Sequence, residues 1–219
     1  MATIIRIVLL MGIVTLFSCD GTTTNMVSPK PEDTLQIMPL TVDNYWTYIT
    51  ENFDSFSRVT STNTFTVTVT FDSKHNDSIY YYLDAYSIFY INRADGLWEF
   101  DNLHSKRLAK YPCAIGDSVR YDTMSYQGLD RYGNVATLSA NGLTSVVSLS
   151  SKISLPDSAY YCIEYSADYR FLKVPREQSH RLIDYYAPGI GLIRREFYLF
   201  RSGGYHLQWR NTLVSRKIN

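Results

Sequence analysis

The residues of this chain that could do chemistry are few and widely spaced. Four histidines occur, at His75, His104, His180 and His206, and none stands beside another histidine or a cysteine. The hydrolase and metalloprotease motifs G-x-S-x-G and H-E-x-x-H are missing, as is a C-x-x-C pair. His75-Asn76-Asp77 could supply metal ligands, but the same residues are typical of a solvated turn. We therefore expect no catalytic residue, no metal site and no cofactor, and hence a protein that is not an enzyme.

Cysteine chemistry has three candidates, Cys19, Cys113 and Cys162. If Cys19 is engaged elsewhere, an even pair remains, and Cys113 and Cys162 could form a disulfide in an oxidising compartment. Alternatively they are two separate buried thiols, because free cysteine packs like a small hydrophobic residue. Cys162 with a distant histidine could imitate a thiol protease pair, but its place in an aromatic strand favours a packing role.

Cys19 ends an apolar segment at the start of the chain. The run from Ile7 to Phe17 follows Arg6 and would span only about 16 Å as a helix. A bilayer core needs roughly 30 Å, so the run is typical of a signal peptide rather than a lasting membrane span. Leu16-Phe17-Ser18-Cys19 resembles the bacterial lipobox, although Phe17 replaces the usual small residue. The resemblance implies cleavage before Cys19 and acylation of its sulfur; the alternative is an ordinary secretory signal cut nearby.

These features divide the chain into three parts. Residues 1–18 are expected to be a signal peptide, and residues 19–38 a lipidated flexible tether rich in Thr, Pro and charge. Residues 39–219 remain as one β domain, a size suited to a single core. Two or more acyl chains would hold this domain stably at a membrane.

Strand patterns dominate the rest of the sequence. In Thr64 to Phe71, Phe65, Val67, Val69 and Phe71 alternate with threonines, which predicts a half-buried antiparallel strand. Ser78 to Ile91 reads as one long aromatic strand bent near Asp84-Ala85, and Asp95-Gly96 as a two-residue hairpin turn. Asn141-Gly142 predicts another hairpin, between strands at 135–138 and 143–149. About ten short strands predict an all-β fold, a single antiparallel barrel-like or sandwich domain.

Aromatic residues are abundant, with 19 tyrosines, 10 phenylalanines and 3 tryptophans. Trp46, Trp98, Trp209 and Tyr186 could line a cavity for a hydrophobic ligand. Alternatively these rings belong to the core and to pairs across neighbouring strands, where aromatic side chains are favourable.

Two segments resemble uncharacterised envelope lipoproteins that are frequent in Bacteroidota. Pro39-Leu40 with Asn44-Tyr45-Trp46-Thr47-Tyr48 resembles their "PL-x-x-G-N-x-W-x-Y" opening, with Asp43 in place of the usual glycine. Tyr185 to Glu196 (YYAPGIGLIRRE) resembles their "Y-A-P-G-V-G-L" signature. The resemblance implies an antiparallel, barrel-like sheet, loosely similar to the LolA/LolB-like half-open barrels that ferry lipoproteins across the periplasm. It implies no catalytic residues. From the residues alone, Pro188-Gly189 predicts a structural turn.

Charge is balanced overall but uneven along the chain. Lys and Arg number 21 and Asp and Glu 21, which argues against nucleic acid as a partner. Residues 20–101 hold 12 acidic and 4 basic residues, whereas residues 181–219 hold 2 and 7. Either this asymmetry forms an electrostatic patch, or strands from the two ends lie side by side with opposite charges facing.

Together these observations predict a non-enzymatic lipoprotein of the cell envelope, anchored in the outer membrane and facing the periplasm. Its β domain would bind an envelope partner or have a structural role. The alternative is a carrier of lipid or another hydrophobic ligand, with the sheet curled around an aromatic-lined cavity.

Overall fold

The chain forms one large antiparallel β-sheet in the computed structural model, which describes residues 25–27, 36–100, 105–129, 135–171 and 179–219. The sheet order is β7-β6-β5-β4-β3-β2-β13-β12-β11-β10-β9-β8, and β1 adds a parallel pairing to β10. The strands are β1 (Asn25–Val27), β2 (Tyr45–Phe53), β3 (Val59–His75), β4 (Ser78–Leu83), β5 (Ile88–Arg93), β6 (Gly96–Phe100), β7 (Ser105–Lys110), β8 (Ser118–Leu129), β9 (Val135–Leu155), β10 (Ser158–Phe171), β11 (His180–Ala187), β12 (Gly191–Arg201) and β13 (Gly204–Lys217).

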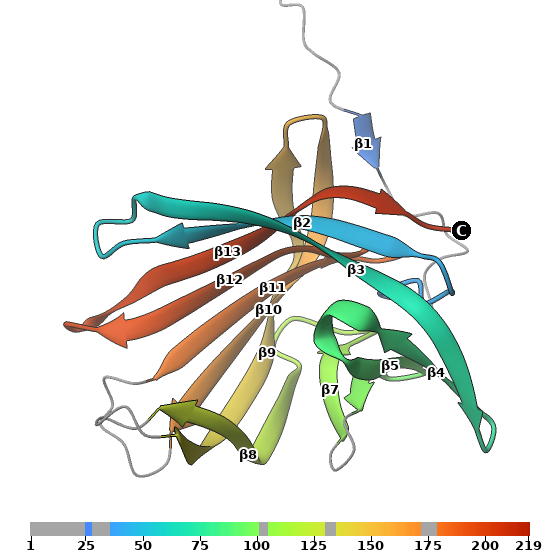
Figure 1. The fold of residues 1–219 in the computed structure, drawn as a ribbon, viewed down its shortest axis with the longest axis horizontal. Helices are drawn as coiled ribbons and strands as arrows, with labels where there is room; N and C mark the ends of the chain where they lie inside the picture. The colour runs from blue at the N-terminus through green and yellow to red at the C-terminus, as the bar shows by residue number, and fades with distance from the viewer. Residues whose placement is uncertain (1–24, 28–35, 101–104, 130–134, 172–178) are drawn as a thin grey trace, which may run out of the picture.

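The sheet curls into a nearly closed barrel (Figure 1). The central pair of the sheet is β2 and β13. Strands β3 to β7 follow in chain order beyond β2, and strands β12 to β8 follow in reverse order beyond β13, so the open edges are β7 and β8. The Tyr165 hydroxyl of β10 donates to the Lys110 carbonyl of β7 at 2.6 Å, which ties the two sides together. The prediction of an all-β, antiparallel, barrel-like domain is therefore confirmed.

The two segments that carried the family resemblance meet inside the barrel. Trp46 and Tyr48 of β2 are fully buried; the Trp46 indole N–H donates to the Ile190 carbonyl at 2.7 Å, and the Tyr48 hydroxyl to the Leu192 carbonyl at 3.0 Å. Gly191 lies between these carbonyls, and a Cβ there would stand 3.2 Å from the Trp46 ring. The opening segment and the hairpin of the signature thus form one structural clamp, in keeping with the turn predicted at Pro188-Gly189.

The residue pair before β2 fixes the entry into this clamp. Asn44 is completely buried; its side-chain amide donates to the Pro39 carbonyl at 2.8 Å, and its Oδ1 accepts the backbone N–H of Asn219 at 2.9 Å. Asp43 has a φ of 68°, in the left-handed region that favours glycine. This backbone conformation suits the glycine that the resemblance leads one to expect at this position.

Asp43→Gly is expected to stabilise the domain by up to about 1 kcal/mol, because glycine removes the steric cost of the left-handed backbone. Asp43 is exposed, so little packing is lost. Urea denaturation would measure the change. Asp72→Gly is the matched control: Asp72 is exposed within β3, and glycine in a strand is expected to cost about 0.5–1 kcal/mol. Destabilisation of both variants alike would contradict the prediction.

Three strand predictions between β3 and β6 need correction. Phe71 leaves the core-facing row of Phe65, Val67 and Val69, because a β-bulge between Val69 and Phe71 turns it to the other face. The expected bend near Asp84-Ala85 is instead a reversal: the 3-10 turn η2 (Asp84–Tyr86) separates two strands, β4 and β5, that pair with each other. The turn predicted at Asp95-Gly96 lies one residue earlier, at Ala94-Asp95, because Arg93 pairs with Gly96.

The hairpin predicted at Asn141-Gly142 is absent. Both residues lie within the continuous strand β9, where Asn141 pairs with Arg170 and Gly142 pairs with both Tyr121 and Tyr169. Continuous pairing with β8 and β10 on its two sides outweighs the local turn preference of this dipeptide.

The boundary between tether and domain also differs from the prediction. Ile37 and Met38 are 1% and 4% exposed and belong to the core, and residues 25–27 form β1. Ordered structure therefore reaches into the segment 19–38. The predicted signal peptide and Cys19 lie outside the described residues.

Charges from the two ends of the chain face each other, as one of the two interpretations predicted. Arg210 of β13 lies 3.6 Å from the Glu51 carboxylate of the adjacent β2, and its Nε donates to Glu196 of β12 at 2.9 Å.

Among the described residues, no helix has the length and apolar character needed to cross a membrane.

Candidate functional site

Six aromatic side chains gather on the outer side of strands β3 to β6. Phe71, Tyr82, Phe89 and Phe100 occupy one row, each directly opposite the next on neighbouring strands. Two residues along the same face are Tyr80 on β4 and Trp98 on β6. We call this set the aromatic face: Phe71, Tyr80, Tyr82, Phe89, Trp98 and Phe100.

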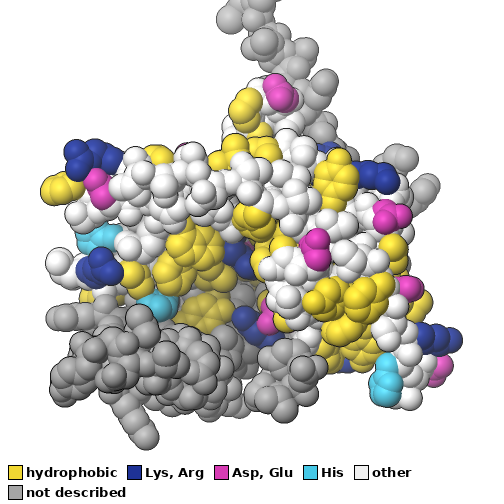
Figure 2. All heavy atoms as spheres, viewed as in Figure 1, with side chains coloured by type: hydrophobic (Ala, Val, Ile, Leu, Met, Phe, Trp, Pro, Cys, Tyr) yellow, Lys and Arg dark blue, Asp and Glu magenta, His cyan; other side chains and the backbone are white. Residues whose placement is uncertain are grey.

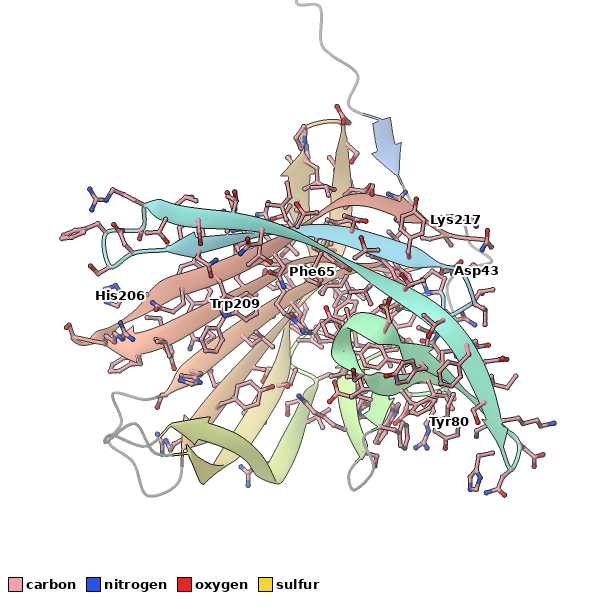
Figure 3. The ribbon with its side chains drawn as sticks, in the orientation of Figure 1. Asp43, Phe65, Tyr80, His206, Trp209 and Lys217 are labelled. Carbon is pink, nitrogen blue, oxygen red and sulfur yellow. The ribbon has the colours of Figure 1, made fainter. Side chains whose placement is uncertain are left out.

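The aromatic face points away from the core because of the alternation along its strands. The residues next to it in sequence, Leu83, Tyr90 and Leu97, are 0%, 4% and 0% exposed and pack into the barrel. Its own members are half-buried, and Phe71 is 46% exposed. Figure 2 shows hydrophobic side chains gathered over this part of the sheet, around the position of Tyr80 labelled in Figure 3.

The rings hold one another in place. Phe71 stacks on Tyr82 with centroids 4.8 Å apart, and Phe89 meets Tyr82 edge-on at 5.3 Å. Tyr80 meets Phe100 edge-on at 5.0 Å. Such pairs are favourable beyond the area they bury, so the rings of the aromatic face are positioned by one another.

Two arginines border the aromatic face. The guanidinium of the exposed Arg93 lies 4.8 Å from the Trp98 ring centre and 4.9 Å from that of Phe100, within cation–π range. Asp95 accepts the Trp98 indole N–H at 2.8 Å and pairs with Arg107 at 2.8 Å. Partial burial acts to raise the pKa of Asp95, but these two donors outweigh it and hold the pKa below its usual value. The carboxylate therefore stays charged and fixes the Trp98 ring.

The interior of the barrel holds a buried ion pair. Asp184 of β11 and Arg195 of β12 are directly opposite in register and form two hydrogen bonds, of 2.6 and 2.8 Å. Burial acts to lower the pKa of Arg195, but the Asp184 carboxylate outweighs it and raises the pKa well above its usual value. The pair is surrounded by five tyrosines, Tyr48, Tyr86, Tyr90, Tyr169 and Tyr186.

The space left around this ion pair is small. Asp184 and Arg195, together with Glu99 and Lys106, line a cavity of about 70 Å³. Arg195, Tyr48 and other side chains line a second cavity of about 10 Å³. A third, of about 190 Å³, lies between the β9–β10 turn and the end of β13. Pockets for small-molecule ligands usually measure about 300–1,000 Å³, so each of these three cavities is smaller than a typical ligand site.

The four residues predicted as ligand-lining lie in three different places. Trp46 and Tyr186 are core residues, 0% and 2% exposed. Trp209 stacks on Phe197 at 5.3 Å on the concave side, on view in Figure 3. Only Trp98 belongs to the aromatic face. The other five members were missed because their shared face depends on strand register, although the aromatic run Tyr80-Tyr81-Tyr82 and the alternation of Trp98 with Phe100 were visible in the sequence.

The two described cysteines are separate thiols, as the alternative prediction had it, and do not form a disulfide. Cys113 and Cys162 are both free. The Cys113 sulfur lies 3.7 Å from the Tyr165 hydroxyl, and Cys162 is completely buried in β10. Burial raises the pKa of the Cys162 thiol to about 12, so it is not an activated nucleophile.

The histidines remain on separate strands. His180 on β11 and His206 on β13 flank Leu199 of β12 in register, and His75 ends β3. His104 lies outside the described residues. Within the described part of the chain, no group of three His, Cys, Asp or Glu side chains is placed to hold a metal ion.

His180 is expected to make stability depend on pH. It lies edge-on to Phe197 at 4.9 Å, and burial lowers its pKa from 6.5 to about 4. The unfolded chain therefore binds a proton that the folded chain resists, and the free energy of unfolding falls as pH drops from 6.5 towards 4. Urea denaturation across this range should show a shallower fall for His180→Gln and an unchanged one for the exposed control His75→Gln. Equal pH dependence in His180→Gln and the parent would contradict the prediction.

Comparisons with known proteins identify two solved structures similar in fold. One is a Bacteroides fragilis protein described as exported, with a YmcC-like fold: TM-score 0.46, 15% identity, covering 82% of this chain and 98% of that one. The other is a Parabacteroides distasonis protein described as a lipoprotein: TM-score 0.42, 13% identity, covering 84% and 99%. No protein-family model matches the chain, and no curated protein matches it. At these TM-scores, neither structure carries a residue role over to this chain.

Proposed function

We propose that this chain is a non-enzymatic lipoprotein of the cell envelope whose β domain binds a partner protein through the aromatic face. The observation that carries the proposal is the contrast between the two sides of the sheet. Six aromatic rings lie half-buried on the outside, while the three cavities described above measure about 190, 70 and 10 Å³. Contiguous apolar surface outside the core is typical of an interaction site.

The composition of the aromatic face favours a protein as the partner. Aromatic residues and arginine are enriched in the buried centre of protein interfaces, where they supply most of the binding energy. Here Arg93 covers Trp98 and Phe100, so a cation and a rigid aromatic surface are presented together. The rings are already ordered by their contacts, so binding would cost little side-chain entropy.

Photocrosslinking tests this assignment. The chain, carrying benzoylphenylalanine in place of Tyr82, is expected to yield a discrete crosslinked protein in intact cells. The control places the same group at Tyr198, a half-buried position on β12, outside the aromatic face. Phe89→Ala should then reduce the Tyr82 crosslink, because it removes the neighbouring ring. Identical crosslinks from positions 82 and 198, or no effect of Phe89→Ala, would refute the assignment.

Membrane anchoring is the second part of the proposal. It rests on Leu16-Phe17-Ser18-Cys19 and on the apolar run before it, with the outer membrane, facing the periplasm, as the proposed location. Labelled palmitate should enter the parent and a Cys113→Ala control but not Cys19→Ala, which should leave the membrane fraction. Palmitate in Cys19→Ala, or an unchanged distribution of that variant, would refute anchoring at Cys19.

A lipid carrier is the alternative function, and cavity size weighs against it. The largest of the three described cavities, about 190 Å³, is smaller than pockets that usually enclose a ligand. Native mass spectrometry of the domain is expected to give the mass of the protein alone. Co-purified lipid would favour the carrier instead.

A further inference from the structure

Strand β10 extends beyond its neighbour β11, and β1 occupies the edge that would otherwise be open. Pairing of β10 with β11 starts at Ile163, whereas Ser158 to Tyr160 lie nearer the turn and pair with β9 on one side. On the other side Asn25, Met26 and Val27 pair in parallel with Ser158, Ala159 and Tyr160. Figure 1 shows β1 beside the projecting β9–β10 hairpin. The pairing satisfies backbone groups that an exposed strand edge would leave unpaired.

This pairing shortens the connection between the domain and the proposed lipid. From Cys19 to Asn25 the chain takes six steps, and at about 3.6 Å per residue it reaches at most about 22 Å. Without β1, the first core residue would be Ile37, eighteen steps away, with a reach of at most about 65 Å. The β1–β10 pairing therefore cuts the maximum reach about threefold.

The surface at this end suits a lipid headgroup region. The cavity of about 190 Å³ lies here, lined by Pro156, Val214 and Arg216 among others. Arg216 donates to the Tyr160 hydroxyl at 2.6 Å, and among the described residues no carboxylate pairs with it. Lys152 is exposed on the same hairpin, and Asp157 is the acidic residue of the turn. Half-exposed Val214 adds apolar surface.

We propose that β1 latches the tether to β10, so that the β9–β10 hairpin end of the domain faces the bilayer surface. This rests on the proposed acylation of Cys19. The opposite region, including the β3–β4 turn, then points away from the membrane (Figure 1). The aromatic face, on β3 to β6, is left accessible to a partner.

Fluorescence quenching in vesicles tests the latch with the full mature lipoprotein. Bimane is attached at Asp157→Cys or at the matched control Asp77→Cys, both exposed turn aspartates, in a Cys113→Ala background. The vesicles contain phosphatidylethanolamine, phosphatidylglycerol and a headgroup spin-labelled phosphatidylcholine. Quenching is expected at position 157 and close to none at position 77.

Proline substitutions that disrupt the β1–β10 pairing provide the second part of the test. Successive backbone N–H groups of a strand point to opposite sides, so prolines at both Met26 and Val27 remove the one that faces β10. Quenching at position 157 should then fall towards the value at position 77. Equal quenching at the two positions in the unmodified tether, or no effect of the prolines, overturns the latch. If the same protein still incorporates palmitate, the proposed lipid anchor stands. A protein without acyl chains overturns both.

Discussion

Asp184→Asn is expected to lower the free energy of unfolding by about 3–5 kcal/mol, because it leaves the Arg195 charge uncompensated inside the barrel. Asp184 and Arg195 side chains are only 11% and 17% exposed, and each makes two hydrogen bonds to the other. The cavity of about 70 Å³ beside them is large enough to admit water, so the loss is expected towards the lower end of this range. Urea or guanidinium denaturation followed by tryptophan fluorescence would measure the loss.

A second ion pair of the same composition supplies the control. Asp168 and Arg181 lie on β10 and β11, with a 2.7 Å contact, but their side chains are 50% and 36% exposed. Water can replace the lost partner there, so Asp168→Asn is expected to cost about 1 kcal/mol or less. The double variant Asp184→Asn/Arg195→Met should recover part of the loss, because it removes the remaining charge. A cost at Asp184 no larger than at Asp168 would show that the interior pair is effectively solvated.

Gly96→Ala is expected to cost about 4 kcal/mol or more and to disturb the aromatic face. A Cβ on Gly96 would overlap the Ala109 carbonyl oxygen, and the φ of 134° is itself unfavourable for alanine. The clash is with backbone of the neighbouring strand β7, so β6 and β7 must separate. Losses of this size are rare for a single methyl group and indicate such a specific clash. Thermal unfolding and the near-ultraviolet circular dichroism of the aromatic residues would report the two effects.

Gly116→Ala measures the free-energy cost of a positive φ for alanine without the steric clash. Gly116 also has a positive φ, of 86°, but nothing lies within 4 Å of the added Cβ. Its cost should therefore be only the left-handed backbone penalty, about 1–2 kcal/mol. If Gly96→Ala costs no more than Gly116→Ala, then β7 does not hold its carbonyl against β6 in solution.

Local sequence patterns predicted most strands because each strand repeats a two-residue period. The alternation of Phe65, Val67 and Val69 with threonines placed the central part of β3 and its buried face correctly. The prediction failed where one extra residue reversed the faces, at the bulge before Phe71. It also failed at Asn141-Gly142, where a strong turn dipeptide lies within the long β9. In both places the pairing partners, which no local pattern contains, determine the outcome.

By itself, the sequence determined the all-β class, the strand periodicity and the segments on which the barrel depends, because these follow from residue types a few positions apart. Only the tertiary structure decided which segments meet. Trp46 reaches the Ile190 carbonyl across 144 residues, and Phe71, Tyr82, Phe89 and Phe100 become neighbours through register across four strands. The aromatic face exists only once the strands pair, since a shift of one residue in any of them would turn its rings to the other side of the sheet.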